Sequence, residues 1–130
     1  MSVSTLKNVN RFEDLIAWQK GRELAKGIYG ATKTGEFAKD FALCGQIRRA
    51  AVSIMANIAE GFERPTTKEF LRFLFIAKSS CAEVRSHLRI ARDINYLPEE
   101  QYNDLKLKAM EVSRILGGLC SSISNKLSRN

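Results

Sequence analysis

Prolines and long apolar runs are nearly absent from the sequence. Its only two prolines, Pro65 and Pro98, fall between runs that have helical periodicity. No apolar stretch approaches the roughly 20 residues of a membrane-spanning helix, and the polar segment from Met1 to Arg11 lacks the apolar core of a signal peptide. No run alternates apolar and polar residues for long, so strands are not expected. These absences predict a helical cytoplasmic protein with no membrane partner.

The residue types that build catalytic and metal sites are also scarce. The three cysteines, Cys44, Cys81 and Cys120, are widely spaced, which excludes a CxxC zinc pair and a disulfide framework. We expect them to be buried free thiols in a reducing compartment. The single histidine, His87, cannot supply the paired Glu-x-x-His motifs of a di-metal bundle, and it faces a different way from Cys81 on the same expected helix. We therefore expect no enzyme activity, no metal and no cofactor.

What the sequence does contain is typical of one globular domain. The chain has 130 residues, of which 45% are hydrophobic and 27% charged, so a single domain is expected over residues 1–130. The net charge is +7 and the pI is near 9.6. Lys and Arg exceed Asp and Glu by 10 to 7 in residues 1–65 and by 11 to 7 in residues 66–130. The excess is therefore not a basic tail, and a basic folded surface makes polyanions plausible partners.

Apolar residues recur at spacings of three and four along most of the chain, which predicts amphipathic helices. The helices are expected over residues 14–33, 40–62, 67–95 and 98–126. Connections of about three to seven residues make consecutive helices antiparallel. The predicted fold class is therefore all-α, a single antiparallel up-down-up-down four-helix bundle.

Residues typical of helix ends support these bounds. Asp40 is a candidate N-cap of the second helix, and Thr66 with Glu69 fits a capping box at the start of the third. Pro98 suits the first position of the fourth helix. That helix also has a strict heptad seam, which is typical of bundle packing. The seam is formed by Tyr102, Leu105, Ala109, Val112, Leu116, Leu119 and Ile123.

A second, polar stripe runs along the second helix. It consists of Gln46, Arg49, Ser53, Asn57, Glu60 and Arg64, at spacings of 3, 4, 4, 3 and 4. One interpretation is a solvated face of an amphipathic helix. The other is a self-association surface, in which polar side chains form hydrogen bonds between subunits. The second interpretation predicts that Asn57 and Glu60 are buried and paired.

The third helix has a basic stripe several turns long. Its members are Lys78, Arg85, Arg89 and Arg92, at spacings of 7, 4 and 3. Such a stripe can follow a phosphate backbone. The alternative is a solvated face that Glu83 and Asp93 partly neutralise. Few aromatic residues share this face, so sequence-specific contacts to bases are not expected.

The polar stripe lies in the part of the sequence that resembles a known family most. Residues 46–54 (QIRRAAVSI) followed by 56–61 (ANIAEG) are similar to the characteristic run of four-helix-bundle proteins encoded by intervening sequences of bacterial large-subunit rRNA genes. Relatives of that family include the accessory variability determinants of diversity-generating retroelements. The resemblance spans about residues 12–123. Supporting matches are Phe12, Leu15, Trp18-Gln19-Lys20, Glu69-Phe70, Arg72-Phe73-Leu74, Ile76-Ala77 and Tyr96-Leu97.

The resemblance implies a bundle that assembles as a ring-like homopentamer. It also implies nucleic acid as a partner, because the retroelement relatives are basic, bind nucleic acid and associate with their reverse transcriptase. Two positions depart from the family pattern. Met55 stands where proline is frequent, which should remove a kink from the second helix, and Ser79 stands where glycine is frequent.

The sequence thus predicts a non-enzymatic, homopentameric accessory protein. It would contact the backbone of structured RNA or DNA through the basic stripe, and a reverse transcriptase is a further candidate partner. The alternative is a homo-oligomeric protein-interaction scaffold without direct affinity for nucleic acid.

Overall fold

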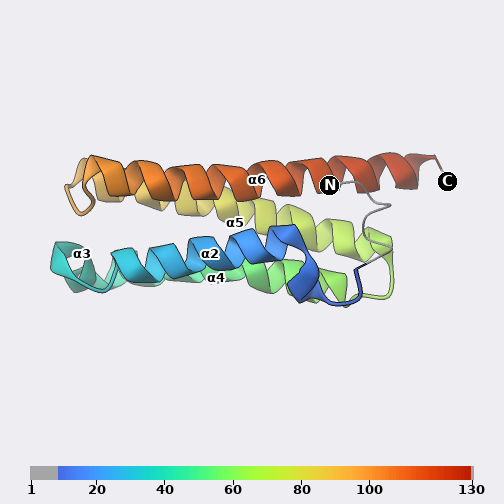
Figure 1. The fold of residues 1–130 in the computed structure, drawn as a ribbon, viewed down its shortest axis with the longest axis horizontal. Helices are drawn as coiled ribbons and strands as arrows, with labels where there is room; N and C mark the ends of the chain where they lie inside the picture. The colour runs from blue at the N-terminus through green and yellow to red at the C-terminus, as the bar shows by residue number, and fades with distance from the viewer. Residues whose placement is uncertain (1–8, 130) are drawn as a thin grey trace.

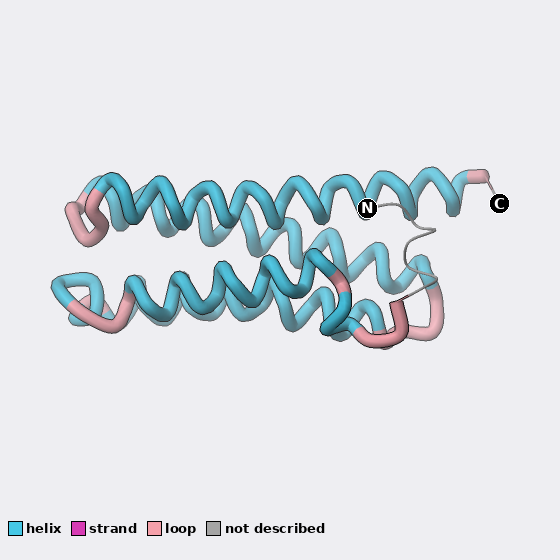
Figure 2. The backbone as a smooth tube through the Cα atoms, in the orientation of Figure 1, coloured by secondary structure: helices cyan, strands magenta, loops and turns pink. Residues whose placement is uncertain are grey.

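The computed structural model describes residues 9–129, and every regular element in this part of the chain is helical (Figure 2). Residues 1–8 of the polar N-terminal segment and residue 130 lie outside the described residues. The elements, in chain order, are the 3-10 helix η1 (Phe12–Asp14) and the α-helices α2 (Ile16–Ala31), α3 (Gly35–Lys39), α4 (Phe41–Phe62), α5 (Thr67–Asp93) and α6 (Glu99–Ser128).

The four long helices α2, α4, α5 and α6 lie along one another and alternate in direction (Figure 1). Helix α4 packs against α2 and α5, and α6 packs against the other sides of the same two helices. The predicted all-α fold and antiparallel helix order are therefore confirmed for the single chain. Assembly into a pentamer stays a prediction.

The bundle core is the apolar side of each long helix. In α6, all the predicted heptad-seam residues from Tyr102 to Ile123 are buried. Ser80 of α5 is one of the few buried polar side chains, and it lies opposite Ser53 of α4 with 3.0 Å between the two hydroxyl oxygens. The side chains of α4 and α5 are thus brought together by both apolar packing and this polar contact.

Both predicted N-caps are present. The Asp40 carboxylate accepts a hydrogen bond from the Leu43 amide at 3.0 Å, and the Thr66 hydroxyl accepts one from the Glu69 amide at 3.2 Å. The Glu69 carboxylate accepts from the Thr66 hydroxyl at 2.8 Å instead of reaching the Thr66 backbone. These contacts satisfy amide groups that the first turn of a helix leaves without a partner.

The first predicted helix, over about residues 14–33, is shorter in the structure. The chain is extended at Leu15 (φ −73°, ψ 129°), which separates η1 from α2, and α2 ends at Ala31. Leu15 is fully buried, so this break places an apolar side chain in the core. The connection that follows contains an unpredicted short helix, α3, whose Phe37 is buried and stacks on Tyr96 with 5.3 Å between ring centroids.

The ends of the last two helices also differ from the prediction. Helix α5 ends at Asp93 because Asn95 adopts a left-handed φ of 65°. The Tyr96 amide then donates to the Ala91 carbonyl at 2.8 Å and the Asn95 amide to the Arg92 carbonyl at 3.1 Å, as in a Schellman cap. Pro98 precedes α6 as its N-cap with an extended ψ of 152°, and α6 continues to Ser128.

Candidate nucleic-acid interface

Three of the four predicted basic residues gather at one end of the seam between α5 and α6. Arg85 and Arg89 line an open groove of about 480 Å³ together with Tyr102 and Lys106 of α6. Arg89, Tyr102 and Lys106 also line an adjoining groove of about 440 Å³, which includes Arg92. The structure therefore converts a stripe on one helix into a basic groove between two helices.

Lys106 is a functional candidate that the sequence analysis missed. It lies one turn after Tyr102 on α6, with its ammonium group 5.9 Å from the centroid of the Tyr102 ring. That spacing was visible in the sequence. Its proximity to Arg85 and Arg89 was not, because it depends on how α5 and α6 align.

Arg89 is held by two neighbours. A hydrogen bond with the Tyr102 hydroxyl is the main cause that raises the pKa of the Arg89 guanidinium, and the nearby Asp93 carboxylate adds to it. The Arg89 Nε atom lies 3.4 Å from Asp93 Oδ1. Arg89 therefore stays cationic beside a partner on each helix.

The other cations of this seam are not neutralised within the chain. Lys78, Arg85, Arg92 and Lys106 have no carboxylate oxygen within 4.0 Å among residues 9–129. Of the two acidic residues that could neutralise the stripe, Asp93 pairs with Arg89. Glu83 instead lies nearest His87, with 3.8 Å between Glu83 Oε2 and His87 Nε2.

Lys78 lies apart from the other three basic residues. It lines a separate groove farther along the same seam, with Phe75 on α5 and Gly117, Ser121 and Ser124 among the residues on α6. A Cβ atom at Gly117 would lie 3.5 Å from Lys78 Cε, so the glycine leaves space beside the lysine stem. The predicted stripe thus divides into a cluster of three and one distant member.

The predicted self-association stripe on α4 is partly paired within the chain. The Asn57 amide donates to the Ser53 carbonyl at 2.8 Å and to the Ser53 hydroxyl at 3.0 Å. Glu60 is exposed and forms an ion pair with Arg64 at 2.9 Å. Asn57 is half-buried, while Gln46 and Arg49 are exposed. Burial of Asn57 and Glu60 between subunits therefore stays a prediction.

Exposed apolar side chains lie on α5 and directly after its end, a feature that the sequence analysis did not identify. Ile76, Ile90 and Ile94 are 43%, 44% and 44% exposed. Ile76 and His87 lie four residues before and seven after Ser80, on the side of α5 that faces α4. The buried His87 Nε2 atom has no hydrogen-bond partner within the described part of the chain, since Glu83 at 3.8 Å is too distant.

The cysteines are buried free thiols, as predicted. Burial raises the pKa of Cys81 to about 12, which makes a thiolate nucleophile at this position unfavourable. Residues 9–129 contain no group of three or more His, Cys, Asp or Glu side chains that could hold a metal ion. None of the helices in this part is long and apolar enough to cross a membrane.

Comparisons with known proteins agree with the sequence resemblance. A protein-family model for the 23S rRNA-intervening sequence protein matches residues 13–118. The fold is similar to a crystal structure of a protein with unknown function from the S23 ribosomal protein family of Bacteroides thetaiotaomicron. That likeness has a TM-score of 0.71 and 27% identity, and covers 78% of this chain and 94% of the other. No curated protein matches the chain. Because the family model matches most of its length, the chain belongs to the 23S rRNA-intervening sequence protein family.

Proposed function

We propose that the protein is a non-enzymatic accessory protein that binds the backbone of structured RNA or DNA as a homo-oligomer. The observation that carries this proposal is the gathering of Arg85, Arg89 and Arg92 in open grooves, where no carboxylate oxygen of residues 9–129 lies within 4.0 Å of Arg85 or Arg92. The net charge of +7 supports it. The family resemblance supports a pentamer, and the three free thiols fit a cytoplasmic location.

The chemistry of the site favours phosphate over bases as the ligand. Surface cations without a carboxylate partner can neutralise phosphates and release counterions, which drives association independently of sequence. Tyr102, the aromatic residue of both grooves, is only 8% exposed, so its ring is not available as a stacking platform. Contacts of this kind position a nucleic acid but do not specify its sequence.

The first test is fluorescence anisotropy of a labelled structured RNA, titrated with the protein at several salt concentrations. We expect saturable binding whose log affinity falls with log salt by about 0.7 to 0.9 for each phosphate contact. Absence of binding at low salt would contradict the proposal.

A charge-reversal pair locates the site. Arg85→Glu combined with Arg89→Glu should weaken binding by at least about tenfold per lost contact at 50 mM salt. Lys26→Glu with Lys33→Glu changes the net charge equally at exposed positions near or on α2, and should have a much smaller effect. Equal losses in the two double variants would show that only net charge matters and that the α5 residues are not the site.

Self-association is proposed through the α4–α5 face, which is defined by the polar stripe on α4, by Ile76 and Ile90 on α5, and by Ile94 directly after α5. Covering the exposed isoleucines with another surface removes apolar area from water, which stabilises the assembled state. The buried His87 Nε2 atom has no hydrogen-bond partner among residues 9–129, and leaving a buried polar group unpaired costs about 1–3 kcal/mol. A second copy of the chain that covers this face would bury the isoleucines and could supply the missing partner.

Light scattering tests this assembly. The pentamer that the resemblance implies would have five times the chain mass of 14.6 kDa. Asn57→Leu or Glu60→Ala should lower the measured mass. Glu36→Ala is a matched control, because Glu36 forms a similar exposed ion pair with Lys39 at the end of the bundle. An unchanged mass with intact helicity in the Asn57 and Glu60 variants would assign these residues to the fold of the single chain.

The second candidate function is a protein-interaction scaffold without affinity for nucleic acid. The exposed isoleucines favour it, because apolar side chains suit a protein partner better than a phosphate backbone. The resemblance makes a reverse transcriptase one candidate partner. A protein that self-associates but leaves RNA anisotropy unchanged at low salt would support the scaffold.

A further inference from the structure

We propose that the bound phosphate backbone lies in the seam between α5 and α6, and that Lys106 of α6 binds it from the wall opposite Arg85 and Arg89. This inference rests on the proposed function, because it assigns the ligand of that function to a defined groove. It adds a binding residue on a second helix and moves the binding site from the surface of α5 to the space between two helices.

The three cations surround one groove with a shared floor. Arg85 and Arg89 line it from α5, and Lys106 lines it from α6. Tyr102 is nearly buried between them, lines the same grooves as Arg89, and presents its ring to the Lys106 ammonium group at 5.9 Å. One aromatic side chain therefore contacts a cation from each wall. A phosphate between the walls would be contacted from both sides.

The charged side chains of the adjoining groove, which contains Arg92, determine where in the seam a phosphate would bind most favourably. That groove contains Arg92 and the side-chain amides of Asn95 and Asn103, which can donate hydrogen bonds to phosphate oxygens. It also contains Asp93 and Glu99 near the turn between the helices, and these carboxylates repel a phosphate. A phosphate is therefore more favourable in the neighbouring groove that Arg85 lines, which lies farther from the turn.

The seam offers further contacts toward its other end. There Lys78 lies beside Ser121, Ser124 and Asn125, whose polar side chains can donate to phosphate oxygens, and Gly117 leaves space between the walls. Lys78 and Arg92 are fourteen residues apart, or about 21 Å along the helix. The basic residues of the seam therefore extend over a length that several successive phosphates of a backbone can span.

The experiment compares two lysines of α6. Lys106 and Lys108 are both half-buried, but Lys108 pairs with Asp104 on the other side of the helix. We expect Lys106→Gln to weaken RNA binding about tenfold at 50 mM salt and to lower the salt slope by about 0.7 to 0.9. Lys108→Gln should change neither quantity. Equal effects of the two variants, with the wild type binding RNA, would overturn the seam assignment and leave the proposed function standing.

A second probe separates this inference from the function itself. Inorganic tripolyphosphate, titrated into the isotopically labelled wild-type protein, should shift the NMR signals of Arg85, Arg89 and Lys106. If the wild type does not bind RNA but these signals shift, the proposed function fails and the anion site stands. If RNA does not bind and tripolyphosphate shifts no seam signal, both proposals are overturned.

Tyr102→Phe tests the positioning role of the hydroxyl. The ring remains to fill the nearly buried position, but the groove shared with Arg89 loses the hydroxyl. We expect weaker RNA binding with an unchanged salt slope, because the number of cations stays the same. A variant with wild-type affinity would show that the hydroxyl does not position Arg89 for binding.

Discussion

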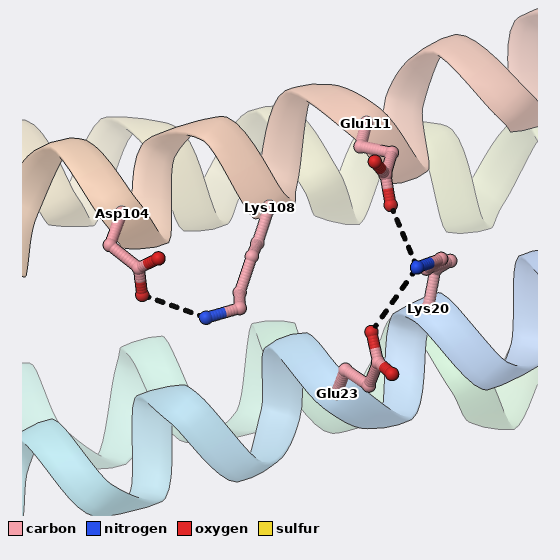
Figure 3. A network of polar contacts seen from close by, with 5 residues as sticks. All are labelled: Lys20, Glu23, Asp104, Lys108 and Glu111. Atoms are coloured by element: carbon pink, nitrogen blue, oxygen red, sulfur yellow. Dashed lines mark hydrogen bonds and ion pairs between the residues drawn. The ribbon is translucent and has the colours of Figure 1, made fainter.

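Helix α6 has two seams with opposite electrostatic character. On the side that faces α2, Lys20 lies between Glu23 at 3.6 Å and Glu111 of α6 at 3.4 Å, and Lys108 lies 2.7 Å from Asp104 (Figure 3). On the side that faces α5, Lys106 and three of the four basic-stripe residues (Lys78, Arg85 and Arg92) have no carboxylate within 4.0 Å in the described residues. The same helix therefore joins a neutralised seam to a cationic one.

The difference shows that the net charge of a chain does not locate its basic surface. Lysines occur on both sides of α6, and what differs is the number of carboxylates that reach them. Carboxylates from α2 and α6 gather in the α2–α6 seam, so its lysines carry little free charge. The α5–α6 seam keeps its charge available for an external anion.

The contrast between the two seams assumes that the shared apolar core holds α6 in place. It would fail if the ion pairs of the α2–α6 seam did so instead. Leu116→Ala removes a fully buried side chain between the seams and should lower the free energy of unfolding by about 2–5 kcal/mol. Leu107→Ala is the matched control, because Leu107 is 64% exposed and its loss should cost under about 0.5 kcal/mol. Urea unfolding followed by circular dichroism measures both. Similar urea midpoints of unfolding for the two variants would contradict the claim that core packing holds α6 in place.

Thiol reactivity distinguishes the open seam from the core beneath it. Cys120 lines the groove beside Lys78, whereas Cys81 is fully buried and burial raises its pKa to about 12. We expect iodoacetamide at pH 8 to alkylate Cys120 at least about tenfold faster than Cys81. Peptide mass spectrometry over time measures the two rates. Equal rates would indicate that both thiols react only through global unfolding.

Alkaline pH should weaken the neutralised seam selectively. The hydrogen bond with Glu111 is the main cause that raises the pKa of Lys20 above its ordinary 10.5. A pKa that is higher in the folded state stabilises the protein below the unfolded pKa, and this contribution is lost as pH rises above 10.5 through the folded pKa. Lys20→Met should therefore lose less stability than the wild type between pH 10 and 12 in urea unfolding.

Comparing the wild type with Lys20→Met isolates the contribution of Lys20 to the pH dependence of stability between pH 10 and 12. Tyr96 is a second contributor, since its hydrogen bond to Asp40 raises its pKa, but it is present in both. Parallel pH profiles for the wild type and Lys20→Met would mean that the Lys20 contacts do not contribute to stability.

The smallest expected effect concerns the second ion pair of the α2–α6 seam. Asp104→Asn removes the partner of Lys108, whose side chain is 41% exposed. Exposed pairs four residues apart on a helix contribute about 0.3–0.5 kcal/mol, and salt screens them. Urea unfolding in low and high salt should show a small loss that disappears in high salt. A loss above about 1 kcal/mol would show that this seam carries more of the stability than we propose.

Local features of the fold were predicted well. The caps at Asp40 and Thr66 and the heptad seam of α6 were all found, because a cap contacts the next turn and a seam repeats along one helix. The short helix α3 was missed. Its Phe37 does not belong to a long helical apolar pattern, and it is buried in the packed structure, where Tyr96, far along the chain, stacks on it.

The candidate site was predicted in part for the same reason. Spacing alone placed Arg85, Arg89 and Arg92 on one face of α5, and the structure brings them into adjoining grooves. Lys78 shares that face but lies in a different groove, and Lys106 enters from another helix. Neither fact can be obtained from the periodicity of α5, because each depends on which residues of α6 lie opposite.

The amino-acid sequence alone therefore determined the helical class, the antiparallel order and the residues that point into the core. These follow from periodicity, capping and short connections, all of which act over a few neighbouring residues. Only the packed bundle decided which cations stay free. The alignment of α6 against α2 brings Glu111 to Lys20, whereas Lys108 pairs with Asp104 one turn away on α6 itself. In the packed bundle no carboxylate oxygen of residues 9–129 comes within 4.0 Å of Arg85, Arg92 or Lys106. Pairing between distant charges depends on that alignment, and side-chain packing across the core sets it.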